Sequence, residues 1–145
     1  MTTLHTHIAL RRLWWAGPLS VVSAVAAVLA VRVAAFAALD LSPTFPPLTW
    51  NALVVFTTVL VTAGVGVFAG VALAAANPIR LYRRIALGFL AVSMIPDLLL
   101  PGRGPGATWT ASVVLMVMHV AAWWPAASIL TRCTIGPHAN PPPAR

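Results

Sequence analysis

Three ionisable residues stand inside long apolar stretches of this sequence: Arg32, Asp97 and His119. Each would cost on the order of 2.5 to 3.5 kcal/mol at the centre of a membrane helix unless it were paired or hydrated. The chemistry open to such residues is ion pairing, proton binding or contact with a polar substrate. We therefore treat Arg32, Asp97 and His119 as a candidate intramembrane polar site.

Arg32 and Asp97 come to similar heights if their apolar stretches cross a membrane. At about 1.5 Å per residue, the Arg32 backbone lies roughly 27 Å from the inner surface and the Asp97 backbone roughly 20 Å from it. One interpretation is a structural ion pair, because helix side chains lean toward the helix N-terminus and Arg32 can reach Asp97. Another is that Arg32 extends to the outer headgroups, with Asp40 as a nearby counter-charge and Asp97 in the outer interface. A third gives the two residues a role in transport or a proton relay.

His119 lies close to the middle of its apolar stretch, roughly 16 Å deep at about 1.5 Å per residue. It is interpreted as a neutral histidine hydrogen-bonded across the bundle, as a proton or substrate contact, or as a metal or haem ligand. Met116 on the same helix face adds only a second soft ligand, and Cys133 is the single cysteine. We therefore predict no metal site and no cofactor. The hydroxyl groups expected to bond a neutral His119 belong to Thr57, Thr58, Thr62 and Ser93.

The composition places these residues in a membrane protein. The chain has 145 residues, of which 60% are hydrophobic and 8% charged, and its mean hydropathy is +0.91. An ordinary soluble domain has about 25% charged residues, so a soluble or disordered chain is excluded. The net charge of +7 comes from arginines that stand singly or in pairs beside apolar runs. This pattern indicates contact with a lipid bilayer and not with nucleic acid.

Four apolar stretches reach the roughly 20 residues that a helix needs to cross a bilayer. Proline and glycine interrupt the chain between them. The sequence therefore predicts an all-α, integral membrane four-helix bundle over residues 13–132. Residues 1–12 form a cytoplasmic N-terminus, and the proline-rich residues 133–145 a disordered cytoplasmic tail. The expected helices cover residues 13–39, 51–76, 81–100 and 108–131.

The arginines also predict the orientation of the bundle. Most of them flank one side of the expected spans, whereas Arg103 lies on the other, so both termini are expected in the cytoplasm (N-in/C-in). Trp14 and Trp15 would stand in the inner interfacial belt, and Trp50 and Trp109 in the outer one. The arginines of the inner side are Arg11, Arg12, Arg80, Arg83, Arg84, Arg132 and Arg145.

Small residues recur every four positions in the first two expected spans, which lets helix backbones approach closely. Gly66 and Gly70 stand at the centre of the row in the second span, and we predict that they pack helices together. Packing within one chain and a homo-oligomer through the second span both remain open. The two rows are Thr58, Thr62, Gly66, Gly70 and Ala74, and Ala26, Ala30, Ala34 and Ala38.

Three segments resemble a known family. They are residues 10–17 (LRRLWWAG), residues 93–98 (SMIPDL), and residues 107–109 and 116–122 (ATW and MVMHVAA) leading to Arg132. Together they are similar to small four-span actinobacterial membrane proteins classed as a domain of unknown function. The resemblance covers all four expected spans and implies a bacterial inner-membrane helical bundle. It implies no activity and no site residues.

The residue types give little support to an enzyme. The chain has no glutamate, no lysine beside a phosphate-binding glycine loop, and no serine, histidine and aspartate at supporting positions. We therefore expect a non-enzymatic structural or protein-interaction bundle in the bacterial cytoplasmic (inner) membrane. The alternative is a small oligomeric transporter or channel that uses Arg32, Asp97 and His119.

Overall fold

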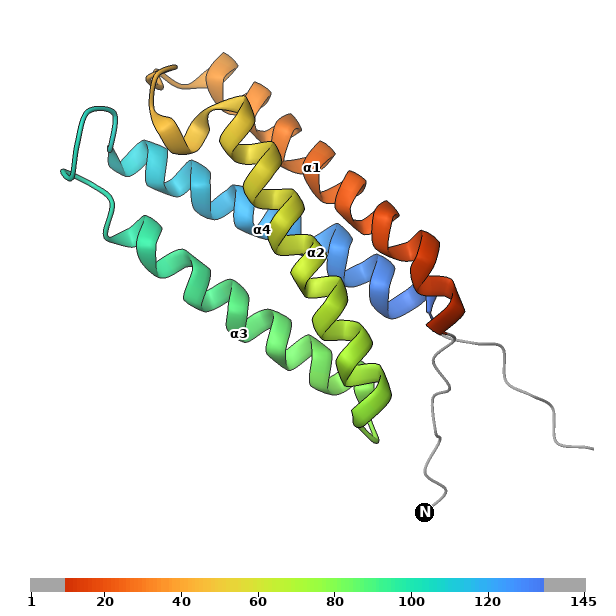
Figure 1. Ribbon diagram of the computed structural model, residues 1–145. Helices are drawn as coiled ribbons and strands as arrows, with labels where there is room; N and C mark the ends of the chain where they lie inside the picture. The colour runs from red at the N-terminus through yellow and green to blue at the C-terminus, as the bar shows by residue number, and fades with distance from the viewer. Residues whose placement is uncertain (1–9, 135–145) are drawn as a thin grey trace, which may run out of the picture.

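A computed structural model describes residues 10–134, and these form an all-helical bundle (Figure 1). The four long helices in this part of the chain confirm the all-helical part of the predicted fold class. A 3-10 turn, η1, precedes the first helix, and another, η2, precedes the second. The elements are η1 (Leu10–Arg12), α1 (Leu13–Ala38), η2 (Pro46–Leu48), α2 (Trp50–Ala74), α3 (Pro78–Leu98) and α4 (Trp109–Cys133).

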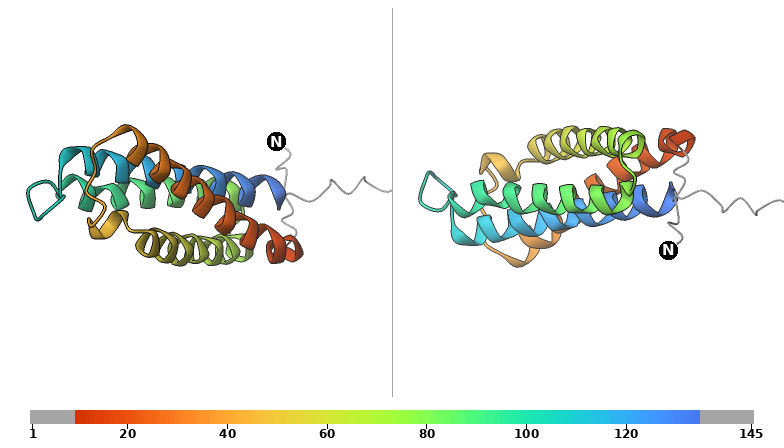
Figure 2. Two further views of the ribbon diagram at one scale, coloured as in Figure 1. Left: turned by 90° about the horizontal axis from the view of Figure 1, so that it is seen from above. Right: turned by 90° about the horizontal axis from the view of Figure 1, so that it is seen from below.

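Successive helices run in opposite directions, so α1 begins and α4 ends at the same end of the bundle (Figures 1 and 2). A hydrogen bond of 3.4 Å from Arg12 Nη1 to the carbonyl oxygen of Cys133 joins these two ends. Helix α3 begins three residues before the expected range, because Pro78 suits the first position of a helix. It ends at Leu98, shortly before Pro101, where a helix is disfavoured.

Helix α4 is the centre of the bundle and carries the largest share of buried side chains. The buried face of α1 packs along α4, and a cluster around Leu48, Leu115 and Met118 fills the end near η2. At the opposite end, Phe68 of α2 meets Tyr82 of α3 edge to face, with ring centroids 4.8 Å apart. Each end of the bundle thus has its own apolar cluster.

The predicted packing role of Gly66 and Gly70 within the chain is wrong. A Cβ atom built on either glycine meets nothing within 4 Å, so both face outward. Phe68 is fully buried two residues further along, and two residues turn a helix by about 200°, which puts Gly66 on the opposite side. The close approach occurs at Gly17 of α1, whose added Cβ would lie 3.2 Å from Val65 of α2.

The alanine row of α1 also faces outward, for the same reason. Ala24 and Val28 are buried against the other helices, whereas Ala26 and Ala30 are exposed. Residues two apart lie on nearly opposite sides of a helix. The buried row of α1 is therefore offset by two residues from the row of alanines at fourfold spacing.

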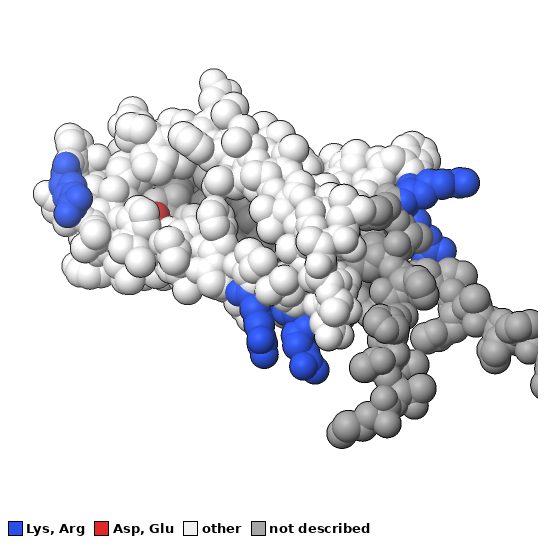
Figure 3. All heavy atoms as spheres, turned by 60° about the horizontal axis from the view of Figure 1, so that its bottom comes forward, with Lys and Arg blue, Asp and Glu red and all other residues white. Residues whose placement is uncertain are grey.

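Three of the four helices, α1, α2 and α4, are long and apolar enough to cross a membrane. Helix α3 is less apolar because Arg80, Arg83 and Arg84 lie in its first two turns. Basic side chains stand in a few groups on this face of the molecule, where a small acidic spot is also visible (Figure 3). The described chain is therefore a helical bundle with the surface of a membrane protein.

Candidate functional site: a buried carboxylate and a histidine between α3 and α4

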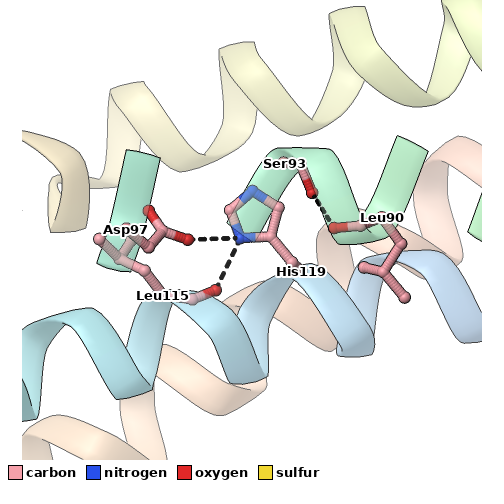
Figure 4. A network of polar contacts seen from close by, with 5 residues as sticks. All are labelled: Leu90, Ser93, Asp97, Leu115 and His119. Carbon is pink, nitrogen blue, oxygen red and sulfur yellow. Dashed lines mark hydrogen bonds and ion pairs between the residues drawn. The ribbon is translucent and has the colours of Figure 1, made fainter. Parts of the chain in front are cut away.

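Asp97 and His119 meet where α3 packs against α4 (Figure 4). Asp97 lies in the last turn of α3, directly after Pro96, and is only 8% exposed. His119 lies in the middle of α4, and its Nδ1 atom is 3.1 Å from Oδ2 of Asp97. A carboxylate near a helix C-terminus faces the negative end of the helix dipole, so a neighbouring histidine that can carry positive charge relieves that contact.

The Nδ1 atom of His119 faces two acceptors. It lies 2.9 Å from the carbonyl oxygen of Leu115, one turn earlier in α4, as well as 3.1 Å from Asp97. An imidazole nitrogen between two acceptors carries its hydrogen, and one N–H bonds well to one acceptor only. Leu115 receives that bond, because Oδ2 of Asp97 is buried without a hydrogen-bond partner. The 3.1 Å contact is therefore chiefly electrostatic.

The second ring nitrogen of His119 is open. With the hydrogen on Nδ1, a neutral His119 has a free electron pair on Nε2. The His119 side chain is 30% exposed, and Nε2 is absent from the buried polar atoms without a partner. In Figure 4 this nitrogen lies on the ring edge away from Leu115. Nε2 has no hydrogen-bond partner among the described residues, so it is the ring nitrogen that can accept a proton or a hydrogen bond.

The expected hydrogen bond from His119 across the bundle does not form. Ser93 lies beside the ring in Figure 4, but its hydroxyl donates to the carbonyl oxygen of Leu90 at 2.8 Å. None of the predicted threonines bonds to His119 either, because its partner is the carbonyl of Leu115 on its own helix. Helical carbonyls accept readily from a polar side chain one turn later, so no partner on another helix is needed.

Arg32 is not the partner of Asp97. Its Nε donates to the carbonyl oxygen of Leu48 at 2.8 Å, beside the turn η2. Its guanidinium carbon lies 4.4 Å from the ring centroid of Phe36 and 4.1 Å from that of Trp50. The side chain thus points toward the far end of α1 and not back toward its N-terminus. Asp40 is exposed and forms no ion pair with a described residue, so the proposed counter-charge does not contact Arg32.

Residues 8–132 match the sequence profile of a family described as "Family of unknown function (DUF6069)". The chain belongs to this family. The match spans all four helices and includes both members of the pair. It confirms the expected resemblance to a family of unknown function. Searches of curated proteins and of solved structures find no match.

In this DUF6069 chain, four groups that orient the polar residues were not predicted from the sequence. The carbonyl groups of Leu115 and Leu48 carry no sequence signal, because every residue has one. Phe36 and Trp50 could have been found: Phe36 stands four residues after Arg32, on the same helix face, and Trp50 opens the next helix. Within residues 10–134, no three histidine, cysteine or acidic residues come together as a metal site would require.

Proposed function

We propose that this chain is a non-enzymatic four-span protein of a bacterial cytoplasmic membrane, with both termini inside. The fourth span is supported by the position of α3 alongside three helices that can cross (Figure 1). It is also supported by the exposed apolar side chains of α3, which suit a lipid environment. The bacterial source rests on the alanine-rich composition with arginine in place of lysine. The exposed apolar residues of α3 include Leu87, Phe89, Val92 and Ile95.

The orientation is supported by the placement of the arginines. The arginines of η1, the first half of α3 and the end of α4 lie toward the end of the bundle where α1 begins. Arg103 lies in the loop at the opposite end. Loops rich in arginine stay in the cytoplasm, so this end faces inward.

The function that this geometry supports best is reversible proton binding at His119, with Asp97 as the counter-charge. The observation that carries the proposal is the pair of acceptors at 2.9 and 3.1 Å from Nδ1, which leaves Nε2 free to accept a proton. The imidazolium ion formed in this way would have the carboxyl group of Asp97 as its nearest charge partner, 3.1 Å from Nδ1.

Two classes of membrane protein would use the pair differently. A structural or interaction bundle needs only the contact of Nδ1 with Asp97 to hold α3 against α4. A small proton-coupled transporter or channel needs a group that exchanges protons, and Nε2, which has no hydrogen-bond partner among the described residues, favours this class. Four helices are too few to enclose a transport pathway, so transport would require several copies of the chain. Arg32 belongs to a separate part of the molecule and has no role in this proposal.

A second copy of the chain is the partner we propose for such an assembly. Within the row of small residues on α2, Gly66 and Gly70 face away from the described part of the chain, because a Cβ atom on either meets nothing within 4 Å. Small residues on a lipid-facing surface allow another helix to approach closely. The Gly66 and Gly70 face of α2 is therefore available to a second protomer.

Nitrogen-15 NMR of His119 in lipid bilayers tests proton binding directly. We expect the two ring nitrogens to report the neutral Nδ1–H form at high pH and the imidazolium form at low pH. Ser93→Ala is the control, because Ser93 lies beside the ring but bonds to Leu90. A His119 signal that keeps one protonation state between about pH 5 and 8, where histidine ordinarily titrates, would exclude the proposal.

Proton flux into liposomes separates the two classes of protein. A transporter or channel should dissipate an imposed pH gradient, and His119→Gln should abolish this flux while Ser93→Ala retains it. Gel filtration of each variant checks that it is folded. Titration of His119 without any protein-dependent flux would instead assign the pair to a structural or interaction bundle.

A further inference from the structure

Arg32 uses only part of its guanidinium group inside the chain. Nε donates to the carbonyl oxygen of Leu48. The two terminal nitrogens, Nη1 and Nη2, have no hydrogen-bond partner among residues 10–134, and neither is one of the buried polar atoms that lack a partner. The edge formed by Nη1 and Nη2 is therefore open to the surroundings and carries unused donors.

Two aromatic rings hold the guanidinium group in place. The guanidinium carbon is 4.4 Å from the ring centroid of Phe36 and 4.1 Å from that of Trp50. Contacts of this kind favour the cation and limit its rotation, and the bond to Leu48 fixes one edge of the plane. The donors on the remaining edge are thus oriented before any ligand binds.

The positive charge of Arg32 has no carboxylate partner in the described chain. Asp97 pairs with His119, and Asp40 makes no ion pair with a described residue. An arginine side chain remains charged in proteins. Because the guanidinium group of Arg32 lies close to apolar surroundings, binding of an external anion would stabilise it. Trp50 beside it is 48% exposed, as is typical of a tryptophan at a membrane surface.

We propose that Arg32 binds a phosphate group at the end of the bundle opposite the start of α1. The edge formed by Nη1 and Nη2 suits two oxygens of one phosphate group, which is a geometry that arginine provides and lysine does not. A lipid headgroup and free phosphate offer the same oxygens. The site goes beyond proton binding at His119 and is independent of it, because the two sites share no residue.

The test compares the full chain in nanodiscs of phosphatidylcholine with nanodiscs that also contain phosphatidylglycerol. Both lipids carry a phosphate group, but that of phosphatidylcholine is balanced by its own quaternary ammonium group, so we expect the anionic lipid to raise the midpoint of thermal unfolding of the unmodified protein. Native mass spectrometry should show phosphatidylglycerol retained on the protein. Arg32→Gln should reduce this retention on the order of tenfold, because charge-assisted hydrogen bonds are lost. Arg103→Gln is the matched control, since it removes one arginine from the same end.

Further arms identify the source of the phosphate and guard against misfolding. Inorganic phosphate is added to the protein in detergent; an Arg32-dependent rise in the unfolding midpoint there, without lipid retention, would assign the site to free phosphate. Trp50→Leu keeps the arginine but removes one ring, and should weaken retention even if Arg32→Gln fails to fold. Retention and unfolding midpoints that are the same in Arg32→Gln, Trp50→Leu and Arg103→Gln would overturn the proposal.

Discussion

A carboxylate beside a histidine behaves differently from one beside an arginine. An arginine keeps its charge at all physiological pH values, so its pair with Asp97 would be permanently neutral. The pair formed with His119 gains one positive charge when Nε2 takes up a proton. The identity of one partner therefore decides whether a buried ion pair is only structural or can also exchange a proton.

A double-mutant cycle should establish the partner of Asp97. Asp97→Asn and His119→Gln should show a coupling energy of about 0.5 to 3 kcal/mol, as contacting residues do. Asp97→Asn and Arg32→Leu should be additive within roughly 0.5 kcal/mol, because the two residues share no partner. The free energy of unfolding in lipid provides the measurement. Coupling of Asp97 to Arg32, and not to His119, would contradict the described geometry.

The sequence identifies the three polar residues but not their partners. Asp97, His119 and Arg32 are conspicuous because charged and titratable groups are rare in apolar stretches. Their pairing depends on rotation about each helix axis, which changes by about 100° per residue. The partner of Arg32 also depends on where the turn at Leu48 places its carbonyl group. The residue types in the sequence do not reveal that position.

At the level of helices, polar side chains bond mostly to their own helix. Ser20 donates to the carbonyl oxygen of Ala16, and Thr131 to that of Ala127, both at 2.7 Å. These bonds satisfy a hydroxyl group without any contact to a second helix. Polar residues inside α1 and α4 are thus compatible with an apolar bundle. The contacts between helices depend on the shapes of the side chains and not on these hydrogen bonds.

Glycine substitutions should separate the inner and outer faces of the helices. Gly17→Leu should lower the free energy of unfolding by about 1 to 3 kcal/mol, because even a Cβ atom comes within 3.2 Å of Val65. Gly66→Leu should leave the unfolding of the monomer unchanged, since its Cβ meets nothing within 4 Å. The same Gly66→Leu variant should lower the mass of the detergent-solubilised assembly. A strong loss of monomer stability in Gly66→Leu would place that face inside the bundle.

The first turn of α4 depends on one side chain. Thr108 precedes the helix, and its hydroxyl accepts a hydrogen bond of 3.1 Å from the backbone nitrogen of Ala111. Thr108→Ala should destabilise the protein by about 1 kcal/mol, the usual effect of removing such a cap. Thr110→Ala is a control of the same residue type, exposed within the helix. Equal unfolding midpoints for the two variants would argue against the cap.

The positions of the helices can be predicted from the lengths of the apolar stretches and from the proline and glycine residues between them. Which face of each helix is buried cannot be predicted in this way. In a soluble bundle, polar residues would mark the outer side of each helix. Here the outer side is as apolar as the inner side, so Gly66 and Ala26 resemble Gly17 and Ala24 in every respect visible in the sequence. Only the contacts between helices distinguish them.

For the molecule as a whole, the loops at the two ends provide a test of the membrane crossing of α3. In a Cys133→Ser background, cysteines at Thr44 and Gly104 should react with an impermeant thiol reagent added to intact cells. A cysteine at Asn77, between α2 and α3, should not react. These exposed positions lie in loops at opposite ends of the bundle. Equal reactivity at Asn77 and Gly104 would show that α3 does not cross.

The extensive packing of α1 on α4 has a consequence for how the protein is made. In the proposed four-span arrangement α1 would enter the membrane first and α4 last, whereas Ser20 and Ala24 of α1 are fully buried in the complete bundle. Until the ribosome has delivered the final helix, the surface of α1 that α4 will cover remains uncovered. Chains interrupted before Trp109 would therefore lack α4, the helix at the centre of the bundle. Membrane proteases should therefore degrade such fragments faster than the finished chain.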